Sequence, residues 1–478
     1  MNKQNPPYFL VIGLGRSGTS MAEFLASKGK NVIATDIDES KVQIAKKLNK
    51  LGIKTQIGFH DQKTFNLAKI MVPSPGISLH NKYIQSALNK GVKITGELDI
   101  FTKYNDLPVI AITGTNGKTT VTSLTGEMLK KSHITPFVCG NIGTPMIKHL
   151  MTKSNKNKKT DIIVAEISSF QLDLAKNFRP DIGVLLNISQ DHLDRYENFD
   201  RYIDSKWSIF QNQRTSDIAV INNSIHGFNS KYKKIKSKII RFSSNTKDFK
   251  NCDGQINSKE IKINHHMAKL PNCNTIQYDK IIDKDKIDKY KIDTSTIKEL
   301  KGIHNQENIA AACLASLAAG ANFNNILKSI KCFKNLSHRM EFVKTINGIS
   351  FYNDSKATNI DAVIRALEYF QKNIILILGG REKQNDFSLL TNQIKNRVKT
   401  IIAIGETRLK IKDIFEKICP VKIAKTMKNA VQTAFDTALK NDVILLSPAC
   451  ASFDMYENYE LRGDDFINCV EKLPCGTS

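Results

Sequence analysis

Short apolar runs recur along the chain, and stretches with the spacing of amphipathic helices separate most of them. In the first hundred residues the runs FLVIG, NVIATD and KIMVPS alternate with helical patterns such as MAEFLASKG. Strands that alternate with helices are typical of a sheet covered by helices. The first hundred residues are therefore expected to form a small α/β domain.

Two further α/β segments follow the first. One opens with PVIAITGTNGKTT and continues through DIIVAEIS, DIGVLLNIS and DIAVIN, and the other contains GISFYND, NIILILGG, TIIAIG and DVILLSPA. Apolar residues at three- and four-residue spacing predict a helix over 305–320. We expect three α/β domains in series, over 1–104, 105–335 and 336–478, with a Rossmann-like first domain, a mainly parallel central sheet and a Rossmann-like third domain.

Residues 226–300 are rich in lysine and have weak periodicity, so they predict only small strands and long loops. No apolar run in the 478 residues approaches the length of a membrane span. The first residues, MNKQNPPYFLVIG, lack a signal-peptide cleavage region. The nine cysteines are scattered without a CxxC pair, which is typical of reduced thiols, and we expect a cytoplasmic protein.

The formal net charge of +24 raises the question of nucleic-acid binding. The positive charge is densest in residues 153–160, 231–238 and 284–293, which are poor in aromatic residues and interleaved with Asn, Ser and Asp. No known nucleic-acid module accompanies the charge, so solvated lysine-rich faces explain it better. We expect no specific nucleic acid and no membrane as partner.

A first glycine-rich loop follows the first predicted strand. Gly13, Gly15 and Gly18 have the spacing G-x-G-x-x-G, and Asp36 follows about twenty residues later, after a second apolar run. This is the pattern of a dinucleotide-binding turn. Taken alone, it leaves a nicotinamide-dependent dehydrogenase open.

A second glycine-rich loop, AITGTNGKTT over 111–120, is the stronger signal. It runs from an apolar strand into a predicted helix, so its backbone N–H groups and the helix N-terminus favour a phosphate. Lys118 could then reach the β- and γ-phosphates, and the Thr119 hydroxyl stands where a P-loop binds Mg²⁺. Ile112 stands where the general motif has its first glycine, and an ordinary strand–helix turn is the alternative.

Polar side chains follow several predicted strands. In the central segment Glu166 ends one strand, and Asp191, His192 and Asp194 follow another. Side chains just beyond strand ends line the ligand crevice of such sheets, and carboxylates suit Mg²⁺ bound to ATP. Taken alone, His192 would more often be a hydrogen-bonded structural histidine than a ligand, and Lys206, in DRYIDSKWSIF, would by its neighbours be a solvated lysine.

Three polar loops follow strands of the third segment, and together they favour a small-molecule site. They contain the following residues: Asp354, Lys356, Thr358 and Asn359; Lys383; Ser447 and Ser452.

Taken together, these motifs resemble the Mur ligases of bacterial cell-wall synthesis. GTNGKTT is shared by several ligases of the superfamily. EISSFQL, DHLDRY, NDSKATN and SPACASFD are more specific to the branch that adds D-glutamate. The resemblance runs through all three domains, from GLGRSG and SPGI to SPACASFD. It implies an ATP-dependent, amide-forming ligase in which the first loop holds the UDP part of a precursor and carries no hydride.

The resemblance also implies site residues. For ATP these are Gly114, Thr115, Asn116, Gly117, Lys118, Thr119, Thr120, Asn305, Asn308, Arg339 and Asp354. For the UDP substrate, UDP-N-acetylmuramoyl-L-alanine, they are Gly15, Ser17, Asp36, Ser74, Gly76 and Asn141. For D-glutamate they are Lys356, Thr358, Lys383, Ser452 and Tyr459. The implied catalytic residues are Lys118, Glu166, His192 and Lys206.

Two Mg²⁺ ions are implied, with Thr119, Glu166, His192 and Lys206 as ligands, and Lys206 would carry a CO₂-derived carbamate. We expect a monomer that acts on small molecules. Arg381 stands where relatives often have an acidic residue, and Tyr459 where they have Phe, so details of the ATP and glutamate contacts stay open. A sister ligase that adds another amino acid is the main alternative.

Overall fold

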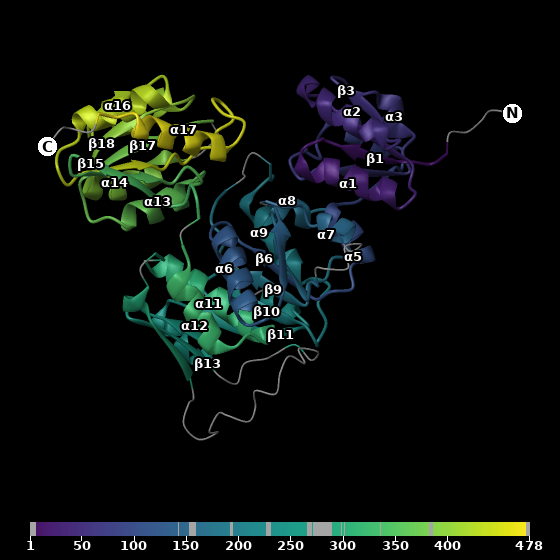
Figure 1. Cartoon of the computed structure of the whole chain (residues 1–478), viewed down its shortest axis with the longest axis horizontal. Coiled ribbons are helices and arrows are strands. Elements are labelled where there is room, and N and C mark those ends of the chain that lie inside the picture. The colour runs from purple at the N-terminus through teal and green to yellow at the C-terminus, as the bar shows by residue number, and fades with distance from the viewer. Residues whose placement is uncertain are drawn as a thin grey trace. The chain divides into compact units, whose positions relative to one another are not determined.

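The structure is a computed structural model, and it describes residues 6–141, 143–152, 159–191, 195–225, 231–264, 270, 289–297, 299–300, 302–334, 336–381 and 386–474. By their contacts the residues fall into two compact units. Unit 1 comprises Met1–Ile188, Asp200–Thr294 and Glu307–Lys331. Unit 2 comprises Ser189–Phe199, Ser295–Gln306 and Cys332–Ser478. Three separate α/β sheets form within these units, which confirms the expected fold class (Figure 1).

The first sheet has the strand order β3-β2-β1-β4-β5, and its described pairs are all parallel. This is the strand order of a doubly wound, Rossmann-like sheet without its sixth strand. Its elements are β1 Phe9–Ile12, α1 Arg16–Ser27, β2 Val32–Asp36, α2 Val42–Lys50, β3 Lys54–Ile57, α3 Gln62–Asn66, β4 Ile70–Pro73, α4 Lys82–Asn89 and β5 Lys93–Ile94. The three apolar runs noted in the sequence are β1, β2 and β4, which form its centre.

The central sheet has the order β14-β13-β12-β11-β10-β9-β6-β8-β7. Its strands are β6 Val109–Thr113, β7 Pro136–Gly140, β8 Ile162–Glu166, β9 Ile182–Leu185, β10 Ile218–Asn222, β11 Lys238–Ser243, β12 Gly254–Ile256, β13 Glu260–Asn264 and β14 Lys289–Asp293. The helices are α5 Glu97–Tyr104, α6 Lys118–Lys131, α7 Lys148–Thr152, α8 Ser169–Leu172, α9 Phe199–Trp207, α11 Ile303–Ala318 and α12 Phe323–Cys332. Every residue of β6 is buried, as expected of a parallel strand with neighbours on both sides.

The lysine-rich segment extends the central sheet. β11 pairs in parallel with β10, whereas β12, β13 and β14 are joined by antiparallel pairing. Ile261 and Ile263 of β13 are buried and alternate with more exposed polar residues, so one face of this extension is covered. The prediction of small strands within 226–300 is therefore confirmed for its described residues.

The third sheet has the order β15-β16-β20-β17-β18-β19, and only β15 pairs in an antiparallel way. Its elements are β15 Glu341–Ile346, β16 Ile349–Asn353, α13 Ile360–Glu368, β17 Ile374–Leu378, α14 Thr391–Arg397, β18 Val398–Ala403, α15 Arg408–Phe415, β19 Val421–Ile423, α16 Met427–Thr437, β20 Val443–Leu446 and α17 Tyr459–Glu471.

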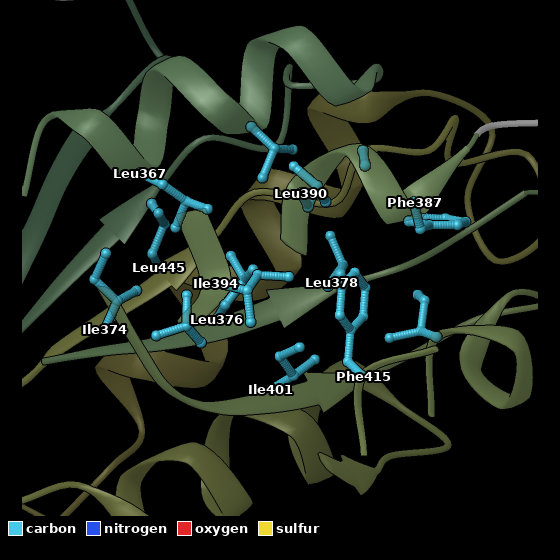
Figure 2. Packing of buried hydrophobic residues seen from close by; sticks show 14 of the residues in the cluster. Leu367, Ile374, Leu376, Leu378, Phe387, Leu390, Ile394, Ile401, Phe415 and Leu445 are labelled. Atoms are coloured by element: carbon cyan, nitrogen blue, oxygen red, sulfur yellow. The ribbon is translucent and has the colours of Figure 1, made fainter. Parts of the chain in front are cut away.

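Alternate residues of β17 enter two different cores. Ile374, Leu376 and Leu378 pack with α13, α14 and α15 on one face, as Figure 2 shows for part of this cluster. Ile375 and Ile377 pack with α16 and α17 on the other face. Helices on both faces of a mainly parallel sheet explain why the strands of this domain are continuous apolar runs. Within the described part of the chain, no helix combines the length and the apolar character needed to cross a membrane.

Candidate active site

The loop between β6 and α6 carries the glycine-rich motif and a left-handed backbone position. Gly117 has φ +86°, which side-chain-bearing residues rarely adopt, and a Cβ there would collide with Oδ1 of Asn308 in α11. Glycine is therefore required both by the turn and by the close approach of Asn308. The structure thus brings Asn308, predicted to contact ATP, directly onto the predicted phosphate loop.

Two lysines meet at this loop. Nζ of Lys118 donates to the carbonyl oxygens of Gly114 at 2.9 Å and Thr115 at 2.8 Å. Nζ of Lys206, from α9, donates to the same Gly114 oxygen at 2.9 Å and lies 4.5 Å from the ring centre of Tyr202. Lys206 is only 2% exposed. The interpretation of Lys206 from its sequence neighbours, a solvated lysine, is therefore wrong.

Glu166 ends β8, next to the phosphate loop, because Ile112 of β6 pairs with Glu166. Its side chain is buried, and Oε1 accepts a hydrogen bond from Nδ2 of Asn141 at 3.3 Å. None of the described residues donates a hydrogen bond to the other oxygen, Oε2. A buried carboxylate oxygen without a donor is suited to a cation, and this fits the predicted metal role.

A second side chain braces the phosphate loop from β9. Asn187 follows that strand, its Oδ1 accepts from N–H of Asn116 at 2.9 Å, and its Nδ2 donates to the Asn116 carbonyl at 3.0 Å. Sequence reasoning missed Asn187, although its position directly after an apolar strand was a usable signal. On the other side, the hydroxyl groups of Thr115 and Tyr202 lie 3.1 Å apart.

The first glycine-rich loop is also closely packed. The Ser74 hydroxyl donates to the Gly13 carbonyl at 2.8 Å, and a Cβ at Gly18 would collide with that same carbonyl oxygen. Asp36 accepts from N–H of Leu14 at 2.6 Å and from N–H of Asp38 at 3.0 Å. Asp36 thus fixes the loop itself. Gly15 caps α1, Ser17 lies in its first turn, and Gly76 is exposed in the loop after β4.

In unit 2, Asp354 follows β16 and is buried. Its Oδ1 accepts from N–H of Met340 at 3.2 Å, and its Oδ2 accepts from the Ser447 hydroxyl at 2.9 Å. Burial raises the pKa of Asp354 to about 7, although Ser447 and the charge of Arg339 act in the opposite direction. The predicted ATP residues Arg339 and Asp354 therefore lie in one polar cluster.

Two loops of unit 2 and the start of α17 carry the described residues that are expected to bind D-glutamate. Nζ of Lys356 lies 5.1 Å from the ring centre of Tyr459, at the start of α17. Ser452 is buried in the loop after β20, and Thr358 is half-buried in the loop after β16. Backbone N–H of Arg381 donates to the Ala451 carbonyl at 2.9 Å, and the Arg381 guanidinium pairs with Glu406 at 3.0 Å.

Arg462 of α17 joins these two loops, and sequence reasoning missed it. Its guanidinium donates to the hydroxyl and carbonyl of Ser355 at 3.0 and 2.7 Å, and to the Cys450 and Ala451 carbonyls at 3.1 and 3.2 Å. Burial lowers the pKa of Arg462 to about 10. Its side chain is 3% exposed, so it acts from inside the domain.

Some predicted residues are not brought into these clusters. His192 and Lys383 lie outside the described residues. Asn305 is in the first turn of α11, within unit 2, and its backbone N–H donates to the Gly302 carbonyl at 3.1 Å. Thr119 and Thr120 lie in the first turn of α6. Among the described residues, no group of three or more His, Cys, Asp or Glu side chains could hold a metal ion.

A cavity of about 680 Å³ lies at the opposite end of the central strands. Arg179, Asp181 and Asp217 are among its lining residues. Both oxygens of Asp217 bind Arg179, and Asp181 accepts from N–H of Val109 at 2.8 Å. Asp181 and Asp217 are thus engaged by protein groups, and we assign no ligand to the cavity.

Comparison with known families matches three consecutive parts of the chain. Residues 8–96 match the Mur ligase MurD-like N-terminal domain, residues 112–316 the Mur ligase middle domain, and residues 338–450 the Mur ligase glutamate ligase domain. The three matched ranges cover the three α/β sheets in turn. The chain belongs to the Mur ligase family.

Within that family, similar relatives carry the name UDP-N-acetylmuramoylalanine–D-glutamate ligase. The protein of that name from Desulfosudis oleivorans is 39% identical over 471 residues, which cover 98% of this chain and 96% of the relative. The one from Koribacter versatilis is 37% identical over 467 residues, 97% of each chain. The similarity therefore extends over nearly the full length of this chain and of each relative.

Solved structures of other Mur-type ligases share the fold. UDP-N-acetylmuramate–alanine ligase from Thermotoga maritima has a TM-score of 0.59 at 17% identity and covers 97% of this chain and 99% of its own. A pseudomurein peptide ligase type C from Methanothermus fervidus has a TM-score of 0.57 at 19% identity, over 98% of this chain and 100% of its own. At such low identity this likeness concerns the fold alone.

Proposed function

We propose that this chain is an ATP-dependent ligase that adds D-glutamate to UDP-N-acetylmuramoyl-L-alanine in peptidoglycan precursor synthesis. The observation that carries the proposal is the loop 114–117, on which Lys118, Lys206 and Asn308 converge. This phosphate site lies in a chain whose nearly full-length relatives bear the name of that ligase. We further propose domains 1–104, 105–335 and 336–478, a monomer, and action in the cytoplasm.

The proposed reaction needs an activated carboxylate, because hydroxide is a poor leaving group. The terminal carboxylate of the UDP substrate attacks the γ-phosphate of ATP, and an acyl phosphate and ADP form. The amine of D-glutamate then attacks the acyl carbon, and phosphate leaves. Lys118 neutralises phosphate oxygens during the transfer. Lys356, Thr358, Lys383, Ser452 and Tyr459 hold the D-glutamate so that its amine is positioned for attack.

Magnesium fits the buried groups of unit 1 near the phosphate loop, Glu166 and Lys206. Glu166 Oε2 is buried without a hydrogen-bond donor among the described residues, and Lys206 is buried beside the phosphate loop. Thr119, Glu166, His192 and a carbamate on Lys206 would hold two ions. Bound Mg²⁺ supplies positive charge to the phosphate oxygens. Asn305, Asn308, Arg339 and Asp354 are proposed to bind the rest of ATP, and Gly15, Ser17, Asp36, Ser74, Gly76 and Asn141 the UDP substrate.

Phosphate release from ATP tests the proposal. Purified protein is given Mg²⁺ and UDP-N-acetylmuramoyl-L-alanine with a panel of D- and L-amino acids. Release that depends strictly on D-glutamate, with the extended product seen by mass spectrometry, is the expected result. Release with a different amino acid would make the chain a sister ligase with the same chemistry. No release by folded, ATP-binding protein would overturn the proposal.

A further inference from the structure

A buried carboxyl group lies at the start of α5, outside the residues assigned above. Glu97 is the first residue of that helix and is 6% exposed. It falls between the family-matched ranges 8–96 and 112–316. Burying a carboxyl group is unfavourable unless the group is bound, so its partners indicate what it does.

Glu97 contacts two separate segments of the central domain. Its Oε1 accepts a hydrogen bond from N–H of Ile147 at 3.1 Å. Against the larger effect of burial, the side chain of Gln171 in α8 lowers the pKa of the carboxyl group. Oε1 of Gln171 in turn accepts from N–H and Oγ of Ser168 at 3.0 and 3.1 Å. Gln171 thus completes the Ser168 cap of α8 with its amide oxygen. Residues of α5 and α8 are in contact.

Both segments adjoin Glu166. Ser168 follows Glu166 by two residues. Backbone N–H of Asn141 donates to the Glu166 carbonyl at 2.8 Å, and the Asn141 side chain reaches Glu166 Oε1 at 3.3 Å. Asn141 is therefore held by Glu166, and Ile147 by Glu97. Between these two contacts, N–H of Gly140 donates to the Thr144 carbonyl at 2.9 Å.

We propose that Glu97 is a positioning residue: its carboxyl group holds Ile147 and, through residues 143–147 and the hydrogen bond between Gly140 and Thr144, sets the orientation of Asn141 toward Glu166. The inference rests on the proposed function, which gives Asn141 to the UDP substrate and Glu166 to the metal. Glu97 touches neither ligand and acts through these two residues.

The contacts also predict which substitution is tolerated. No described residue donates a hydrogen bond to Oε2 of Glu97. Replacing this oxygen by an NH₂ group therefore breaks no hydrogen bond among the described residues. Burial raises the pKa of Glu97, which favours the uncharged form that glutamine imitates. Glu97→Gln therefore keeps the contact to Ile147, whereas Glu97→Ala removes it.

Hydrogen exchange on the protein alone tests the geometry. In Glu97→Ala the amide of Ile147 must lose protection, and positioning further requires faster exchange at Asn141. Glu97→Gln is expected to exchange like the wild type. Faster exchange confined to Ile147 would overturn the proposal. Asp161→Ala is the matched control, because it removes one acceptor, for N–H of Thr135, at the opposite end of β8.

Steady-state kinetics test the consequence. Glu97→Ala should raise the KM for the UDP substrate and the half-saturating Mg²⁺ concentration by about 10-fold or more, since small misplacements in a site are costly. The KM for D-glutamate should stay within about two-fold, and Glu97→Gln and Asp161→Ala should match the wild type. Unchanged constants in Glu97→Ala, or a loss of kcat alone in proportion to unfolded protein, would refute the positioning role.

Two further measurements distinguish a failure of the positioning role from misfolding of the variant and from a failure of the proposed function. If Glu97→Ala does not fold, Glu97→Asp is measured in the same way, because it keeps the carboxyl group but withdraws it from Ile147. A wild-type protein without D-glutamate-dependent activity would refute the proposed function. The exchange experiment, which needs no substrate, would still decide whether Glu97 positions Asn141.

Discussion

Lys118 and Lys206 donate to one carbonyl oxygen, that of Gly114, over 2.9 Å each. Two ammonium groups at the same atom repel each other, and the repulsion is large where water is excluded. A phosphate oxygen beside Lys118 or a carbamate on Lys206 would relieve it. The pair therefore explains physically why this place suits an anion.

Lys206→Ala is expected to reduce ligase activity at least about 100-fold, because it removes the proposed metal-binding carbamate. Phosphate release measures the loss. Short-chain carboxylates should restore part of the activity by replacing the carbamate. The exposed Lys176→Ala variant should remain active, and an active Lys206→Ala enzyme would exclude the metal role.

Lys118→Ala should lower kcat/KM for ATP by about 100- to 1000-fold, since it removes a preorganised charge from the transferred phosphoryl group. Stopped-flow or coupled assays measure this constant. The shift of the melting temperature by ATP should shrink as well. An unchanged kcat/KM for ATP together with an unchanged shift of the melting temperature by ATP would contradict phosphate binding by Lys118.

Gly117→Ala should abolish most ATP binding, because the added Cβ meets Asn308 as well as a left-handed backbone. Gly91→Ala is the matched control: its φ is +82° and nothing lies within 4 Å of the added atom. Both variants should lose about 1–2 kcal/mol of stability from the backbone alone. Calorimetric titration with ATP should separate them, and equal ATP affinity would contradict the assigned loop.

Asp354 makes the stability of unit 2 depend on pH. The folded pKa of about 7 exceeds the usual 3.8, so this stabilisation is full below about pH 4 and is lost as pH rises through 7. The shift corresponds to roughly 4 kcal/mol. Amide exchange in β16 and β20 should therefore accelerate between pH 5 and 8 less in Asp354→Asn than in the wild type, after correction for intrinsic rates. An equal pH response in both proteins would show that Asp354 does not titrate there.

Arg462→Lys should raise the KM for D-glutamate about ten-fold, because one ammonium cannot replace the forked contacts to the two loops. The KM for the UDP substrate, whose proposed residues are in unit 1, should change little. Arg397→Lys, which also loses a guanidinium contact to a carbonyl, at Phe370, is the control. A uniform effect on every substrate would argue against loop positioning.

The strands at the centres of the sheets could be predicted from the sequence, because buried parallel strands are apolar runs. The sequence was also sufficient for the phosphate loop, whose glycines and Lys118 are consecutive. Edge strands such as β3 and β19 have weaker apolar patterns and were missed. The pattern of the lysine-rich segment 226–300 predicted short strands. The pairing of these strands could not be predicted, because it depends on partners distant in sequence.

Buried polar residues were harder to predict than strands. Lys206 is placed by Gly114, which is 92 residues away, and Arg462 contacts Ser355 at a separation of 107. No local pattern marks such residues, since a lysine or arginine on a helix is usually exposed. Family resemblance identified Lys206, and neither route identified Glu97, Asn187 or Arg462.

The two outer strands of the central sheet bear on solubility. An open sheet edge is a template for aggregation unless charges or proline protect it. β7 begins with Pro136, which has no N–H to donate, and β14 carries the exposed Lys291. Part of the charge that first suggested nucleic acid therefore guards a nine-stranded sheet against pairing with other chains.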